Sequence, residues 1–477
     1  MNREINRRKF LQISAAGGAI CLGGTDIFSY NANQIKRRII KSKVKVARIY
    51  LGTSFGLWPK PDLNFDEEIR KYKTEFEKFK SEFLDVEFIV DKLITSNEEL
   101  NSVIDRLKEV DGILAIQFNI GIMPVLKKIL EMGKPTMVFA VPYSGHEWIR
   151  FGTMQKQKIG ARMECMLTSD YSQLVTAIKP FRAIHHLGEA KILNLTTQQS
   201  DEYVSKIKNR FGTEIKMIKL KRVIDTYNSI DDKKAKKETE KWIKNAEKVV
   251  EPSEEEIFRS CKLALAFEKL LDEENATVMT VDCYGTMWDK TIKLPAYPCI
   301  GFTRLNDMGL GGICESDLRA AMTYIILQGL TGRPGFISDP TVDESSNTII
   351  LAHCLGTTKM DGPDKPSAPY KLRSIMERRE GAVPQVKMRV GQRVTQAILI
   401  DSDNLRYFTG EIIDTPVSIK YDRGCRTKIV VKVDGSVENL WRNWTDGLHR
   451  LTCYGDIARE LKYFCKFKNI KIIDESV

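Results

Sequence analysis

Short apolar segments alternate with longer amphipathic ones from residue 46 onward, and this alternation constrains the fold more than any other feature. Strands are expected at 46–52, 86–90, 112–118 and 135–141. One helix is expected from Phe65 to about Phe83, and another begins at the capping box from Ser96 to Glu99. Strands that alternate with helices across short loops form a parallel sheet covered by helices on both faces. The sequence therefore predicts a doubly wound α/β domain over residues 46–184.

The alternation starts again after residue 185 and stops near residue 346. Further strands are expected at 190–197, 213–220 and 276–283, which predicts a second doubly wound domain over residues 185–345. Short β segments then follow at 348–355, 386–391, 393–401, 405–412, 416–421 and 426–435. Gly, Asp, Asn and Pro separate them, a spacing typical of an antiparallel sheet or small barrel. We expect a β-rich third domain over residues 346–477, with a long polar loop at 356–385.

The N-terminus resembles a twin-arginine export signal over residues 1–32, followed by a basic linker over 33–45. Arg7 and Arg8 precede a Gly- and Ala-rich apolar stretch. The ten cysteines include no Cys-x-x-Cys pair, which is typical of folding in a reducing compartment. Because the twin-arginine pathway carries folded proteins, the two observations agree. We expect recognition by this export machinery and a periplasmic or other extracytoplasmic location; a basic tail on a cytoplasmic protein remains the alternative.

The net charge of +11 does not indicate a nucleic-acid-binding protein. Much of the basic excess lies at 35–48, in the expected linker, and at 231–248, where charges of both signs alternate along an expected helix. Neither stretch contains interleaved aromatic residues or a known reading motif. We therefore expect no nucleic-acid partner.

Two carboxylates flank an amphipathic helix expected near residues 318–330. Glu315 is expected at the start of this helix, and Asp339 at the end of the next strand. In a doubly wound domain these positions share one rim of the sheet. Two ionised carboxylates repel each other, so a divalent cation is an economical partner. Helix capping and turn formation explain the same residues equally simply, and spacing alone does not choose between these interpretations.

Two of the five histidines are candidates to complete such a site. His449 lies in a polar loop before the last helix, and His353 lies in an expected strand, where a structural role in the core is equally consistent. Two carboxylates with one or two imidazoles favour manganese, with magnesium or iron less favoured.

Four motifs in order resemble the L-fucose isomerase family, with a weaker likeness to arabinose isomerases. They are "CESD" before a helix, "SDP" after it, "AHC" in the next strand and a late H-x-x-x-x-"YGD". The resemblance covers about residue 250 to the C-terminus and implies two α/β domains followed by a β-rich one. It also implies metal binding by Glu315, Asp339 and His449, with His353 near an additional ligand of arabinose isomerases. A homo-oligomer, a trimer or hexamer whose neighbouring subunits complete each site, is implied as well.

The resemblance implies aldose–ketose isomerisation of a sugar or sugar derivative through a cis-enediolate. Glu315 and Asp339 would serve as acid/base pair as well as ligands. Trp288, Trp441 and Trp444 are candidates to stack on the sugar, although burial in the core explains such residues more often. Thr445 replaces an Asn of the family pattern. Two other functions remain open: a non-enzymatic exported sugar-binding protein, and a metal-dependent sugar epimerase or lyase.

Overall fold

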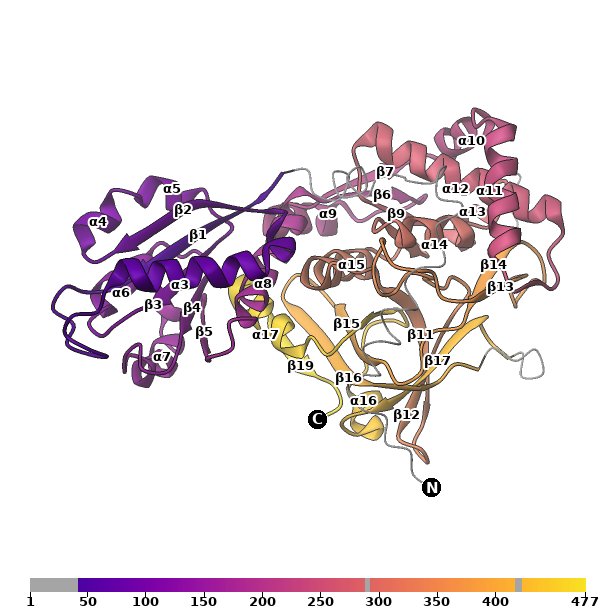
Figure 1. Ribbon diagram of the computed structural model, residues 1–477. Helices are drawn as coiled ribbons and strands as arrows, with labels where there is room; N and C mark the ends of the chain where they lie inside the picture. The colour runs from indigo at the N-terminus through magenta and orange to yellow at the C-terminus, as the bar shows by residue number, and fades with distance from the viewer. Residues whose placement is uncertain (1–41, 288–291, 417–422) are drawn as a thin grey trace, which may run out of the picture.

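The computed structural model describes residues 42–287, 292–416 and 423–477, which form two parallel α/β sheets and an antiparallel barrel (Figure 1). The expected twin-arginine signal and Trp288 lie outside the described residues, as do most of the basic linker and most of the strand expected at 416–421. Among the helices of the described part, none has the length and apolarity that a membrane span requires.

The first sheet contains five parallel strands in the order β2-β1-β3-β4-β5, as a doubly wound domain requires. Its elements include β1 (Val44–Leu51), β2 (Val86–Ile94), β3 (Gly112–Gln117), β4 (Thr136–Ala140), β5 (Met163–Leu167), α3 (Phe65–Lys78), α6 (Met123–Glu131) and α8 (Gln173–Glu189). Successive strand residues enter different apolar cores on the two faces: Ile113 belongs to one core and Leu114 to the other. The predicted α/β fold is confirmed, and β5 was not predicted.

The second sheet has four parallel strands in the order β10-β9-β6-β7. Its elements include β6 (Lys191–Leu195), β7 (Glu214–Ile218), β9 (Val278–Val281), β10 (Gly311–Cys314), α9 (Asp201–Phe211), α12 (Glu254–Glu274), α14 (Cys299–Asp307) and α15 (Leu318–Thr331). A capping box between Ser253 and Glu256 begins α12. The second parallel sheet is therefore also confirmed.

Six antiparallel strands close into a barrel in the order β15-β18-β11-β12-β17-β16, with β16 pairing back to β15. They are β11 (Phe336–Asp343), β12 (Thr348–His353), β15 (Arg393–Leu399), β16 (Asn404–Asp414), β17 (Thr427–Val433) and β18 (Arg450–Tyr454). The strand β19 (Lys471–Asp474) is added parallel to β16. The predicted barrel-like region is confirmed.

One strand belongs to a different sheet from the one predicted. The strand that carries Asp339 was expected to continue the second parallel sheet, but β11 pairs in antiparallel fashion with β12 and β18. A short apolar strand has the same sequence pattern in a parallel and in an antiparallel sheet, because only its pairing partners differ. The polar loop expected at 356–385 also contains regular structure, since β13 (Tyr370–Arg373) and β14 (Val383–Val386) pair within it or at its end.

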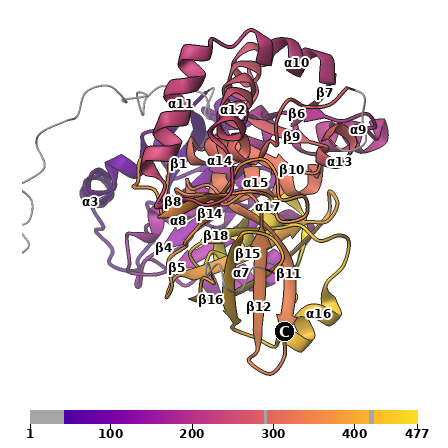
Figure 2. The same ribbon diagram turned by 90° about the vertical axis from the view of Figure 1, so that its right-hand side faces the viewer.

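Helix α15 joins the second α/β sheet to the barrel. It contacts β10 on the α/β side and β15 and β18 on the barrel side (Figures 1 and 2). The Leu399 N–H of β15 donates to Thr323 Oγ1 of α15 at 2.8 Å. The helix α17 (Ala458–Lys468) returns from the barrel to contact α8 and β5 of the first domain. The barrel and both sheets are thus held together by helices.

Candidate metal and active site

The predicted ligands come together where the second sheet meets the barrel. Glu315 directly follows β10, Asp339 lies in β11, His353 ends β12, and His449 directly precedes β18. The register that pairs Ser338 with Arg450 brings the next residues, Asp339 and His449, opposite each other on adjacent strands. Three chain segments of the barrel and one of the α/β domain therefore supply the site.

Glu315 lies in a turn rather than at the helix start that the sequence predicted. Glu315 and Ser316 have left-handed backbones, with φ of 58° and 56°, and α15 begins only at Leu318. The N-cap is Asp317, whose Oδ1 accepts from the Ala320 N–H at 3.0 Å. A left-handed conformation costs a non-glycine residue about 1 kcal/mol, and such strain is often kept where it positions a functional group.

His449 is the common neighbour of the three carboxylates. Its Nε2 lies 3.5 Å from Asp339 Oδ1 and 4.0 Å from Glu315 Oε2. Its Nδ1 lies 3.3 Å from Asp317 Oδ2. A carboxylate on one ring nitrogen fixes the imidazole and leaves the other nitrogen for an ion, as in many metal sites. Asp317 was not predicted to be functional, because a helix cap accounts for an Asp at this position and no further signal in the sequence marks it.

His353 lies beside His449 and Asp339, but its Nδ1 contacts a backbone N–H rather than a carboxylate. Asp339, His353 and His449 each offer one ligand atom, and the three atoms lie within 4.8 Å of one another. The Leu355 N–H, however, donates to His353 Nδ1 at 3.2 Å. A neutral ring that accepts at Nδ1 carries its proton on Nε2, so in this tautomer His353 presents a donor to the site. Its role as a ligand stays a prediction.

Burial and neighbouring negative charges act on the carboxylates of the site. Burial raises the pKa of Glu315, and the charges of Asp339 and Asp317 raise it further. Burial and the charge of Glu377 raise the pKa of Asp339. Asp339 Oδ1 is buried, and none of the described residues donates a hydrogen bond to it. Burying a carboxylate oxygen without a hydrogen-bond donor costs free energy. A cation bound to that oxygen would offset the cost.

The pKa values of the two imidazoles are shifted in opposite directions. Burial lowers the pKa of His353 to about 3, so this ring is neutral at physiological pH. Burial also disfavours charge on His449, but the hydrogen bond with Asp317 and the charges of Asp339 and Glu315 outweigh it and raise the pKa. His449 is therefore the ring whose charge responds to the carboxylates and to any ion among them.

Two predicted sugar-stacking residues already make contacts of their own. Trp444 Nε1 donates to the Gly447 carbonyl at 2.9 Å, and the Arg450 guanidinium lies 4.1 Å from the Trp444 ring centre. Trp444 thus supports the loop before His449. Trp441, on α16 (Val437–Asn443), donates to Glu344 Oε1 at 2.6 Å, at the turn between β11 and β12. Their role in substrate binding stays a prediction.

The fold and site together define a carboxylate–imidazole site at the junction of a parallel α/β domain and a closed antiparallel barrel. Two curated relatives bear the same name: a sulfoquinovose isomerase of Alkalicoccus urumqiensis, 22% identical over 231 residues, and one of Clostridium sp. (strain MSTE9), 28% identical over 184 residues. The matches cover 45% and 34% of this chain and 48% and 37% of those proteins. The chain thus spans less than half the length of either relative.

No protein-family model matches the chain. The two relatives support a sugar-isomerase-like relationship, in agreement with the motifs at the site. The resemblance to fucose isomerases in particular stays a prediction.

Proposed function

We propose that the protein is a metal-dependent aldose–ketose isomerase that acts on a monosaccharide or sugar derivative through a cis-enediolate. The convergence of Glu315 and Asp339 on the Nε2 atom of His449 is the observation that carries this proposal. The sugar-isomerase-like relationship supports it independently.

The donor set fits a divalent cation. Glu315, Asp339 and His449 offer carboxylate and imidazole ligands, and the buried Asp339 Oδ1 accepts no hydrogen bond from the part of the chain that the structure describes. This mixture favours Mn²⁺, with Mg²⁺ and Fe²⁺ as alternatives. When bound, such an ion polarises a sugar carbonyl and stabilises negative charge on adjacent oxygens.

The side chains supply the proton transfers of the reaction. An aldose and a ketose interconvert when a proton leaves the carbon beside the carbonyl and returns to the neighbouring carbon. Glu315 and Asp339 are the carboxylates for this task, because their side chains are 39% and 33% exposed and burial raises both pKa values toward neutrality. Asp317 holds the His449 ring in place, and the His353 Nε2–H is a donor for a substrate oxygen.

A hexose bearing a sulfonate is the first substrate to test, because both relatives are named for sulfoquinovose. Arg319, in the first turn of α15, provides a cation for such a group beside the site. Its Nε lies 3.8 Å from Asp317 Oδ1, and its guanidinium lies against Gly447 in the loop before His449.

Oligomeric assembly and export complete the proposal. Exposed aromatic residues lie on the segments that follow β1 and β4: the Trp58 and Tyr143 rings are 6.3 Å apart, and Trp148, the first residue of α7 (Trp148–Gln155), is exposed. An exposed aromatic group of this kind suits a subunit contact, as a trimer or hexamer would use.

The twin-arginine pattern at Arg7 and Arg8 supports export to the periplasm.

One experiment tests the reaction. The purified protein is stripped with a chelator, returned to Mn²⁺, and incubated in D₂O with a panel of aldoses that includes sulfoquinovose. We expect a ketose that carries deuterium beside the carbonyl, formed only when the ion is present. Deuterium incorporation with an epimeric aldose and no ketose would indicate an epimerase instead. Saturable sugar binding without exchange would indicate a binding protein and overturn the proposal.

A further inference from the structure

A second cluster of ligating side chains lies beside the proposed active site and takes no part in the proposed reaction. Cys354 directly follows β12, Cys425 lies shortly before β17, and Glu377 lies between β13 and β14. One ligand atom from each lies within 4.8 Å of the other two. The β12–β17 pairing, which places His353 opposite Thr427, brings the two cysteines together from distant parts of the chain.

The spacing of the cluster suits a tetrahedral ion. With Zn–S of about 2.3 Å and Zn–O of about 2.1 Å, tetrahedral angles place a sulfur and an oxygen ligand about 3.6 Å apart. The observed separation of Cys425 Sγ and Glu377 Oε1 is 3.8 Å. Neither cysteine is in a disulfide, so both sulfurs are available as ligands.

Exposure within the cluster provides an entry for an ion. Cys354 is buried, Cys425 is half-buried, and Glu377 is exposed. The thiol end is therefore shielded from water, whereas the carboxylate end faces solvent and can move to meet an ion. Thiolates select soft or borderline cations such as Zn²⁺, whereas the nearby carboxylate–imidazole group selects harder ones.

We propose that Cys354, Cys425 and Glu377 form a second cation site, specific for a thiophilic divalent ion such as Zn²⁺. Binding replaces the two thiol protons, which pass to solvent, and leaves a fourth position for water. The ion ties the segment between β13 and β14 to the ends of β12 and β17. It thereby fixes the chain next to His353 at the edge of the active site.

Cobalt is a suitable probe, because Co²⁺ replaces Zn²⁺ at tetrahedral sites and thiolate ligands give it a strong charge-transfer band in the near ultraviolet. Carboxylate and imidazole ligands give no such band. Co²⁺ is titrated into the reduced, metal-free full-length protein, and Zn²⁺ is then added. We expect saturable growth of the thiolate band and its loss on addition of Zn²⁺. Absence of the band at saturating Co²⁺ would overturn the proposal.

Substitutions assign the band to these residues. Cys354→Ser and Cys425→Ser should each weaken Co²⁺ binding by about tenfold or more and reduce the band. Glu377→Gln, at an exposed position, should weaken binding yet keep the band. Cys165→Ser, a partly buried cysteine of β5, is the matched control and should change nothing. An unchanged band in both Cys354→Ser and Cys425→Ser would refute the assignment.

The isomerase assay separates this inference from the proposed function. A missing thiolate band in a protein with Mn²⁺-dependent activity overturns the second site alone. A thiolate band in a protein without isomerase activity supports the second site and overturns the proposed function alone.

Discussion

Asp339 and His449 face each other from adjacent antiparallel strands of the barrel, with His449 Nε2 3.5 Å from Asp339 Oδ1. The other nitrogen of the same ring contacts Asp317, the N-cap of a helix that packs on the parallel sheet. One imidazole is thus held between the barrel and the α/β domain. The site forms only when the barrel and the α/β domain are packed against each other. A change in that packing would therefore change the geometry of the site.

Removing either carboxylate should abolish most activity without unfolding the protein. Acid/base groups typically contribute about 100- to 10,000-fold to rate. Asp339→Asn and Glu315→Gln should therefore each lower kcat/KM by about 100-fold or more. Steady-state assays on the best aldose give the rates, and circular dichroism checks the fold. Asp343→Asn removes an exposed carboxylate from the same strand and should keep full activity. A fully active Glu315→Gln enzyme would contradict the assignment.

Binding of Mn²⁺ should release a proton and strengthen as pH rises. The neighbouring carboxylates raise the pKa of His449 despite its burial, so the metal-free ring is charged below that pKa. An ion binds only the neutral ring, so affinity should rise by up to about tenfold per pH unit until that pKa is passed. Calorimetry in buffers of different ionisation enthalpy measures the released proton.

Two histidine variants show whether His449 or His353 causes the pH dependence of Mn²⁺ binding. His449→Gln should weaken Mn²⁺ binding and remove its pH dependence. His353→Gln should keep the pH dependence, because burial lowers the pKa of His353 to about 3 and leaves this ring neutral throughout. Affinity that does not change with pH in the wild type would contradict the role of His449.

The proximity of Glu315, Asp339 and His449 was predictable from sequence, but part of the reasoning that placed them was wrong. Their role as ligands stays a prediction. Spacing put Glu315 and Asp339 on one rim of a parallel sheet, whereas they meet across a domain junction. Local sequence does not show which sheet a short strand such as β11 will join, because pairing depends on strands far along the chain. His449 was a candidate both from its place in a polar loop and from the resemblance, and it lies beside both carboxylates. Its role as a ligand stays a prediction.

Asp317 shows the opposite limit. It is both the N-cap of α15 and the partner of His449, but only the first role has a local sequence signature. The alternating strands and helices were predictable because their periodicity is local. The short strands β13 and β14 were not, because Pro and Gly interrupt the segment around them.

Close packing of α15 against α8 should make one glycine irreplaceable. A Cβ atom on Gly329 would lie 2.5 Å from the Ala183 Cα, a backbone atom that cannot rotate away. Overpacking of this kind costs about 1–3 kcal/mol, so Gly329→Ala should lower the free energy of unfolding by that amount. Gly152→Ala, in α7 (Trp148–Gln155) with open space at the Cβ, should raise it by about 0.5–1 kcal/mol. Chemical denaturation measures both.

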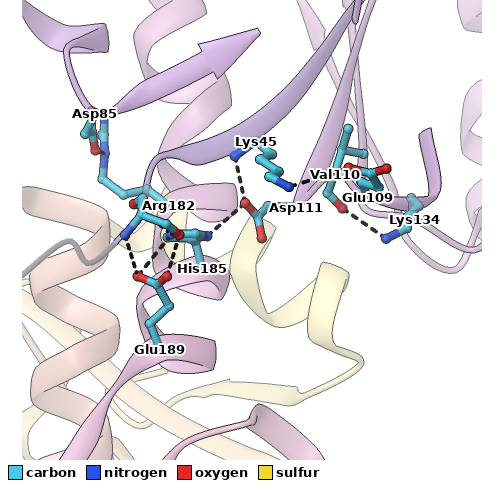
Figure 3. Close-up of polar contacts among 10 residues, drawn as sticks. Lys45, Asp85, Glu109, Val110, Asp111, Lys134, Arg182, His185 and Glu189 are labelled. Carbon is cyan, nitrogen blue, oxygen red and sulfur yellow. Dashed lines mark hydrogen bonds and ion pairs between the residues drawn. The ribbon is translucent and has the colours of Figure 1, made fainter. Parts of the chain in front are cut away.

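The N-terminal end of the described chain is fastened by a histidine between two carboxylates (Figure 3). His185 Nδ1 lies 2.9 Å from Asp111 Oδ2, and its Nε2 lies 3.3 Å from Glu189 Oε2 and 3.1 Å from the Ser42 carbonyl. Burial opposes charge on His185, but the hydrogen bond with Asp111 and the two carboxylate charges outweigh it and raise the pKa. The charged ring therefore stabilises the folded state.

This network should stabilise the protein more at acidic than at basic pH. A group whose pKa is raised by folding contributes fully below its unfolded pKa, and the contribution is lost as pH rises through the folded value. The stability difference between wild type and His185→Gln should therefore shrink by about 1 kcal/mol between about pH 5.5 and about pH 8.5. His146→Gln replaces an exposed histidine whose ring centre lies 4.9 Å from that of Trp58, and it serves as the matched substitution. A difference that grows with pH would mean that His185 is held neutral, because only a folded pKa below the unfolded one gives that sign.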